Sequence, residues 1–224
     1  MTPDHIAFQV ATWLIPLVAA IVLHEVSHGW VANAFGDPTA RRLRRLSLNP
    51  LRHVDPVGTL ALPLILAVSG APVFGWAKPV PVVQRRLRNP RVHMMLVALA
   101  GPGMNLLLAL FAAVALAGLR WLAPGNSLFW LFIVFNVANF LIINVFLAIF
   151  NMLPIPPFDG SHVVEGLLPP PLAVRYRRLG RFGLPILLFL LVLLPMLAPS
   201  LDLVGLIVEP PVRLIVTLLG LPLA

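Results

Sequence analysis

Apolar runs long enough to cross a bilayer dominate this chain and limit what it can fold into. Hydrophobic residues make up 59% of its 224 residues and charged residues only 11%, whereas average soluble domains carry about a quarter charged residues. A helix needs about 20 apolar residues to span the hydrocarbon core, and such runs recur. Residues 1–5 lack a basic n-region, so the first run is expected to stay in the mature protein. The sequence therefore predicts an all-α polytopic membrane protein.

Helix and turn signals divide the chain into about five transmembrane helices and one interrupted apolar stretch. The expected helices cover residues 6–35, 90–122, 127–150, 182–198 and 203–221. Pro16 is expected to bend the first helix. Residues 57–76 are broken by glycines and prolines, and a short helix is expected after Asp159. The whole chain, 1–224, is predicted to be one transmembrane domain, with its core over residues 6–168 and C-terminal helices over residues 182–221.

Basic clusters predict the orientation. Arginine and lysine gather within residues 41–52, 78–91 and 175–181, and the positive-inside rule places such loops in the cytoplasm. Because two clusters flank residues 57–76, a single crossing there would put one of them outside. We therefore favour a re-entrant hairpin, with a true span as the alternative. The net charge of +8 also suits anionic lipid headgroups, and no nucleic-acid partner is expected.

A motif inside the first helix predicts a metal site. His24 and His28 lie one turn apart on one helix face, so both imidazoles can bind one zinc ion. Glu25 projects from the neighbouring flank, where it can act as general base toward water. The alternative is a chance match, but an unpaired carboxylate in an apolar helix is costly. Since the chain has no cysteine, a transition-metal site must use histidine and carboxylate.

A third ligand is needed, because catalytic zinc usually has three protein ligands and one open position. Asp159 follows the inward-running helix 127–150 and a proline break that frees the backbone from helical geometry. In the orientation predicted from charge, Asp159 comes to the same side as His24 and His28. Those two lie about 10–17 Å below the inner end of their helix. The alternative is that Asp159 only caps the helix after it.

Two motifs together resemble the site-2 protease family of intramembrane zinc metalloproteases. The first is H-E-x-x-H at residues 24–28, and the second is N-x-x-P-x-P-x-x-D-G at residues 151–160. Further similarities are found in residues 49–56, 75–80 and 101–105, and together they cover about residues 20–165. The chain resembles a short form of the family, without the PDZ or CBS domain that members often carry.

This resemblance implies a metalloendopeptidase that cleaves transmembrane segments of other proteins. It implies a prokaryotic inner or plasma membrane, an active site toward the cytoplasm, and two partners, a transmembrane protein substrate and the lipid bilayer. The residues that it assigns are His24, His28 and Asp159 as ligands of one Zn²⁺ per chain, Glu25 as general base, and Asn151 and Asn105 at the substrate carbonyl.

Two other functions remain open. A membrane metal transporter or channel would use the same histidines and aspartate as ion ligands, but it does not explain why Glu25 has the spacing of a general base. A catalytically inactive relative could act as a binding scaffold, although the motifs are intact.

Several other polar residues have two interpretations each. Four asparagines on helix 127–150 share one arc and could line a wet cavity or, more commonly, bond to neighbouring helices; they are Asn136, Asn139, Asn144 and Asn151. Residues 73–83 could form an edge strand that receives substrate by strand addition, or a surface loop. The histidines not expected to bind metal are His53, His93 and His162.

Overall fold

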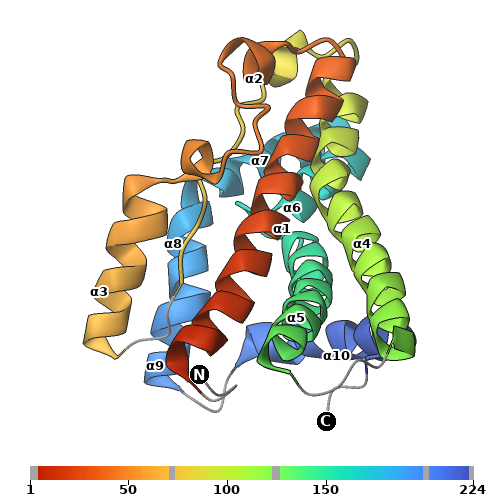
Figure 1. Ribbon diagram of the computed structural model, residues 1–224. Helices are drawn as coiled ribbons and strands as arrows, with labels where there is room; N and C mark the ends of the chain where they lie inside the picture. The colour runs from red at the N-terminus through yellow and green to blue at the C-terminus, as the bar shows by residue number, and fades with distance from the viewer. Residues whose placement is uncertain (1–4, 71–73, 123–126, 199–201, 222–224) are drawn as a thin grey trace.

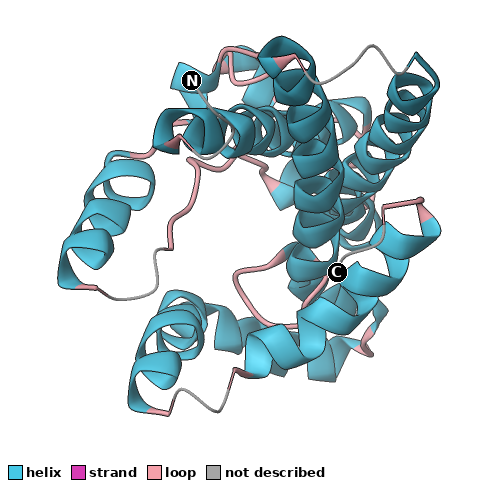
Figure 2. Ribbon diagram, turned by 60° about the horizontal axis from the view of Figure 1, so that its bottom comes forward, coloured by secondary structure: helices cyan, strands magenta, loops and turns pink. Residues whose placement is uncertain are grey.

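Three long helices form the centre of the molecule and pack against one another in every pair (Figure 1). They are α1 (Ile6–Ala34), α4 (Pro90–Leu122) and α5 (Leu128–Asn151). The computed structural model describes residues 5–70, 74–122, 127–198 and 202–221, and the regular structure of these ranges is helical (Figure 2). Buried alanines such as Ala20 and Ala109 let the helix backbones approach closely, as in other membrane bundles.

A fourth apolar helical run covers Pro170–Leu197. It consists of α7 (Pro170–Arg177), η4 (Arg178–Phe182), α8 (Gly183–Leu188), η5 (Phe189–Leu193) and α9 (Leu194–Leu197). Pro185 and Pro195 lack the N–H of a helical hydrogen bond, which explains why the run changes helix type. Four helices in the described ranges are thus long and apolar enough to cross a membrane, which confirms the prediction of a multi-pass membrane protein.

The fifth predicted crossing is not confirmed. Helix α10 (Leu203–Leu218) has 16 residues, about 24 Å of helix, whereas the hydrocarbon core is about 30 Å thick. It lies across the ends of α4 and α5 (Figure 1). Its inner face, Val208, Val212 and Val216, is buried in the same apolar cluster as residues of α5. An apolar run packed sideways on a bundle has the composition of a crossing, which is why the sequence suggested one.

The segment between α1 and α4 begins and ends near the same point of the helix bundle. It runs out through η2 (Pro56–Ala61) and α3 (Leu62–Ser69), and it returns through residues 74–83, the return loop. The N–H of Trp76 donates to the carbonyl of Gly58 at 3.0 Å, so the two ends of the excursion touch. The hairpin interpretation of this segment requires such a contact between its ends.

The predicted short β segment is absent from the described part of the return loop, and residue 73 lies outside that part. Pro79 and Pro81 have no N–H to offer a strand. The N–H of Val80 between them donates to the side chain of Glu25. The loop interpretation of this segment is therefore the one that the structure supports.

Three short helices and one buried carboxylate stabilise the segments that connect α1 to α4. The helices are α2 (Thr39–Arg42), η1 (Pro50–His53) and η3 (Gln84–Arg86). Asp37 is 0% exposed and accepts hydrogen bonds from the N–H groups of Thr39, at 3.1 Å, and Val83, at 2.6 Å. Burial alone would raise the pKa of Asp37, but the hydroxyl of Thr39 also donates to its carboxylate, and together with the two N–H groups it holds that pKa below its usual value. Asp37 thus ties α1 to the return loop.

Helix α1 continues through Pro16, and a side chain from α5 compensates for the missing N–H. The carbonyl of Thr12 would normally bond to the N–H of residue 16, which proline lacks. Asn139 donates its amide to that carbonyl at 2.9 Å. Asn139 therefore links two helices, as the packing interpretation of this residue expects.

Candidate metal centre

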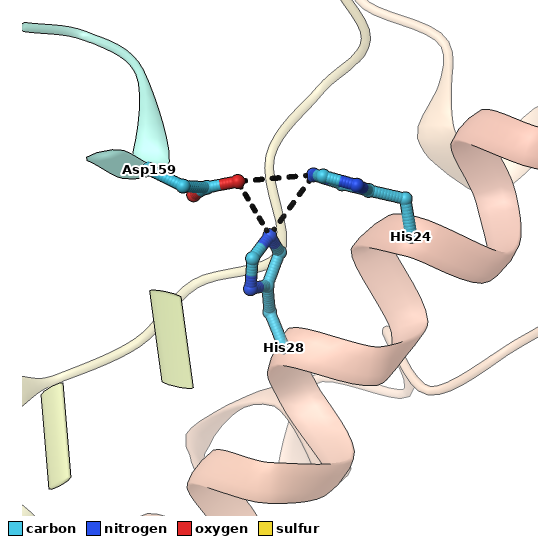
Figure 3. A group of neighbouring side chains, drawn as sticks. All are labelled: His24, His28 and Asp159. Atoms are coloured by element: carbon cyan, nitrogen blue, oxygen red, sulfur yellow. Dashed lines mark hydrogen bonds and ion pairs between the residues drawn. The ribbon is translucent and has the colours of Figure 1, made fainter. Parts of the chain in front are cut away.

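Two imidazoles on α1 and one carboxylate meet inside the bundle (Figure 3). His24 and His28 are 6% and 8% exposed, and their Nε2 atoms lie 3.1 Å apart. The Oδ2 atom of Asp159 lies 3.2 Å from the first Nε2 and 3.3 Å from the second. Residues 131 positions apart in the chain thus present three ligand atoms to one point.

Asp159 reaches this point because α6 (Asp159–Leu167) starts directly against the end of α5. A Cβ atom on Gly160 would lie 2.3 Å from the carbonyl oxygen of Met152, so only glycine permits this close approach. The N-cap residue of α6 is Phe158, and Asp159 is the first helical residue. The interpretation of Asp159 as a simple N-cap is therefore wrong, and its carboxylate turns toward the histidines.

The hydrogen bonds of the two imidazoles show which nitrogens are free. The Nδ1 atom of His28 contacts the carbonyl oxygen of Val97 at 2.7 Å, and Nδ1 of His24 contacts Oδ1 of Asn105. Both oxygens can only accept, so each Nδ1 carries a proton, and in the neutral imidazole each Nε2 then carries a lone pair. Second-sphere bonds of this kind are usual for histidines that bind metal.

With both imidazoles neutral, three buried lone pairs face one another. The Oδ2 atom of Asp159 is buried and receives no hydrogen bond from the described residues. Buried acceptors without a donor are strongly unfavourable. A cation removes this cost, and two nitrogens with one carboxylate oxygen form a ligand set that zinc takes in catalytic sites. The residues present fit a zinc ion.

Helix α4 passes so close to the imidazoles that one position must be glycine. A Cβ atom on Gly101 would lie 2.4 Å from Nε2 of His28 and 2.6 Å from Nε2 of His24. Gly101 belongs to residues 101–105, one of the stretches similar to the site-2 protease family, and it forms one wall of the metal centre.

Glu25 lies beside the ligands in a cavity of about 610 Å³. One carboxylate oxygen, Oε2, accepts the N–H of Val80 at 2.7 Å. The cavity is lined by α1, the return loop, the end of α5 and α8, through residues such as Trp76, Phe150, Leu184 and Leu187. Its volume lies within the range of ordinary ligand pockets.

Comparison with known proteins agrees with this geometry. The sequence profile of peptidase family M50 matches residues 119–194, which include the second motif. YwhC of Bacillus subtilis is 36% identical over 184 residues, which cover 80% of this chain and 79% of YwhC. The chain belongs to peptidase family M50. Two Rip2 proteins cover 86% of the chain and 68% of their own length, at 32% identity in Mycolicibacterium smegmatis and 33% in Mycobacterium tuberculosis.

Each of these three relatives carries the name "Putative zinc metalloprotease". The resemblance to the site-2 protease family is therefore confirmed, and the chain is a zinc metalloprotease. No solved structure matches this M50 peptidase.

The remaining residues that the sequence singled out have different positions in the M50 peptidase. Asn151 lines the cavity, and its amide donates to the carbonyl of Leu147 at 2.9 Å. Asn105 is 0% exposed and is bonded within the bundle, so its predicted contact with a substrate carbonyl has no support in the structure. His162 lines the cavity, whereas the other two histidines lie elsewhere: His53 bonds to Ser47, and His93 stacks on Phe35.

Sequence reasoning missed two partners of the site. The N–H of Val80 is a main-chain group, and a pattern of residue types does not reveal such a group. The two flanking prolines do, however, leave it as the lone main-chain donor of residues 79–81. Asn144 was expected to bond to a neighbouring helix, and its contact with Asn105 on α4 confirms this. Its connection to His24 through Asn105 was not predicted.

Proposed function

We propose that this M50 peptidase is an intramembrane endopeptidase that cleaves transmembrane segments of other membrane proteins. In this proposal His24, His28 and Asp159 hold the zinc ion, and Glu25 is the general base. The observation that carries it is the convergence of three potential ligand atoms beside a cavity that Glu25 also lines. The helices around that cavity are long and apolar enough to lie in a bilayer.

Each side chain has a distinct task. Zinc, when bound, supplies a Lewis acid that polarises the scissile carbonyl and makes water more acidic. Glu25 accepts a proton from the attacking water and delivers it to the leaving amine. The N–H of Val80 holds one oxygen of Glu25, which leaves the other oxygen for the proton. Asn151 uses one amide hydrogen on Leu147, and its second hydrogen is available to the substrate carbonyl.

The site lies nearer one end of the bundle, and charge indicates which membrane face that is. His28 is six residues from the end of α1 at Ala34, about 9 Å, whereas His24 is eighteen residues from Ile6, about 27 Å. The arginines of α2 follow the nearer end (Figure 1). The positive-inside rule then puts the active site toward the cytoplasm of a cell membrane. With both ends of its excursion at that face, the segment from η2 to the return loop is re-entrant.

The geometry also limits the substrate. A peptide carbonyl in a helix is already hydrogen-bonded and is shielded by side chains. A transmembrane helix must therefore unwind before it can place a carbonyl beside Glu25 and the ligands. Glycine and proline lower the cost of local unwinding, so we expect cleavage near such residues. The apolar cavity walls suit the side chains of a membrane-spanning segment.

Changing Glu25 to glutamine tests this function. The Glu25→Gln variant keeps the ligands, so we expect unchanged zinc content, while loss of the general base slows cleavage of a model transmembrane substrate by about 10²–10⁴-fold. Glu209→Gln is the matched control, because Glu209 is 55% exposed on α10 and pairs with Arg213 alone among the described residues. A Glu25→Gln variant that cleaves at the wild-type rate would contradict the proposal. Zinc flux in proteoliposomes without cleavage would favour the transporter, and zinc binding with neither would favour the scaffold.

A further inference from the structure

We propose that Asn105 and Asn144 form a hydrogen-bond relay that fixes the tautomer and orientation of His24. In this inference, which rests on the metal site proposed above, both asparagines are positioning residues and neither contacts substrate. The relay joins three helices, because His24 belongs to α1, Asn105 to α4 and Asn144 to α5.

Both asparagines are completely buried and their contacts form one chain. Asn105 and Asn144 are each 0% exposed. The Nδ2 atom of Asn144 donates to the carbonyl oxygen of Phe140 at 2.7 Å. The Nδ2 atom of Asn105 donates to Oδ1 of Asn144, also at 2.7 Å, and Oδ1 of Asn105 meets Nδ1 of His24.

The carbonyl of Phe140 sets the orientation of both amides in the relay. A main-chain carbonyl can only accept, so Asn144 must turn its NH₂ group toward Phe140 and its oxygen toward Asn105. Asn105 must then turn its NH₂ group toward Asn144, which leaves its oxygen for His24. His24 is consequently protonated on Nδ1 and presents the lone pair of Nε2 to the metal centre. If either amide rotated by half a turn, two donors or two acceptors would face each other at a buried contact.

The relay differs from ordinary asparagine packing because it leads to His24, a proposed metal ligand. Asn139 is also buried on α5, but its bond ends on the carbonyl of Thr12, away from the metal centre. His28 needs no relay, because its Nδ1 contacts the carbonyl of Val97 directly. His24 has a side-chain amide at the same place, and an amide can present either a donor or an acceptor. Asn144 removes that ambiguity.

Zinc affinity tests the relay without any need for proteolysis. The dissociation constant for zinc is measured by competition with a chromophoric chelator in detergent, and the ligand field is followed by Co²⁺ absorption. Loss of second-sphere partners typically weakens metal binding by about 10–100-fold. We expect this loss in Asn105→Leu and in Asn144→Leu, although residue 144 touches no ligand. Asn139→Leu is the matched control, and it should destabilise the bundle and leave the zinc affinity unchanged.

Aspartate at position 105 provides the rescue. A carboxylate offers only acceptors, so aspartate at position 105 still accepts the Nδ1 hydrogen of His24 and needs no partner to orient it. Because its second oxygen would face Oδ1 of Asn144, the rescue is tested with Asn144→Leu in the same protein. We expect the double variant Asn105→Asp with Asn144→Leu to bind zinc far more tightly than Asn144→Leu alone.

The outcomes separate the relay from the proposed function. Wild-type zinc affinity in a folded Asn144→Leu protein would overturn the relay, and so would an equal loss in Asn139→Leu. If Asn144→Leu does not fold, an Asn105→Leu protein with the zinc affinity of Asn139→Leu would overturn it. A wild-type protein that binds no zinc would instead refute the metal site itself.

Discussion

Substituting Gly101 by alanine is the sharpest steric test of the metal centre. The added Cβ would lie 2.4 Å from Nε2 of His28, 2.5 Å from Cε1 of His24 and 2.6 Å from Nε2 of His24. Ordinary contact begins at about 3.4 Å, so α4 or the imidazoles must move by about 1 Å. Zinc sites tolerate about 0.2 Å of error in ligand distances. We therefore expect Gly101→Ala to lose zinc affinity by at least about 100-fold.

Gly103→Ala is the control for this experiment. Gly103 lies two residues further along α4, and a Cβ placed there meets nothing within 4 Å. Since alanine has the higher helix propensity, this variant should be as stable as the wild type or slightly more stable. Equilibrium zinc titration of the three proteins in detergent, with elemental analysis of the purified samples, measures the effect. A Gly101→Ala protein with the zinc affinity of Gly103→Ala would refute the packing of α4 against the ligands.

Two further predictions follow from the segments that surround the site. Val80→Pro removes the N–H that holds Glu25. Because a hydrogen bond to a charged group contributes about 1.5–3 kcal/mol, cleavage should slow by about 10–100-fold with zinc content unchanged. Val80→Ala keeps the N–H, and an equal slowing in that variant would contradict the role of the N–H. Because the pKa of folded Asp37 is depressed below its unfolded value of about 3.9, its carboxylate stabilises the fold above that value, and the contribution is lost as the pH falls through the folded pKa. Asp37→Asn should therefore lower the unfolding temperature in detergent at pH 7. The unfolding temperature of this variant should also decrease less than that of the wild type as the pH falls below about 4. An unchanged pH profile would show that Asp37 does not cause the loss of stability in acid.

The sequence predicted best those features that depend on local periodicity. The spacing of His24 and His28 fixes their common helix face in any α-helix, and α4 covers the residues expected from its apolar run. The structure also brings Asp159 to the histidines, as expected from the basic loops and the proline break. Both inferences used only chain-local signals and the requirement that ligands share one membrane face.

The features that the sequence did not predict depend on contacts between distant segments. Asn105 lies 81 residues from His24, and its motif gave no indication that its amide meets an imidazole. Helix α10 is apolar enough to suggest a crossing, but its length and its packing on α5 make it lie across the bundle. Proline spacing within residues 79–81 argued against a strand, yet the acceptor of the one remaining N–H became apparent only from the position of Glu25.

The central claim is that residues far apart in the chain hold one zinc ion, and metal analysis tests it most directly. The wild-type protein, His24→Ala, Asp159→Ala and Glu25→Gln are purified in parallel and their zinc content per chain is determined. We expect one zinc ion per chain in the wild type and in Glu25→Gln, and little or none in the other two. A stoichiometric zinc ion in Asp159→Ala, together with its loss in His24→Ala, would contradict the role of Asp159 as third ligand.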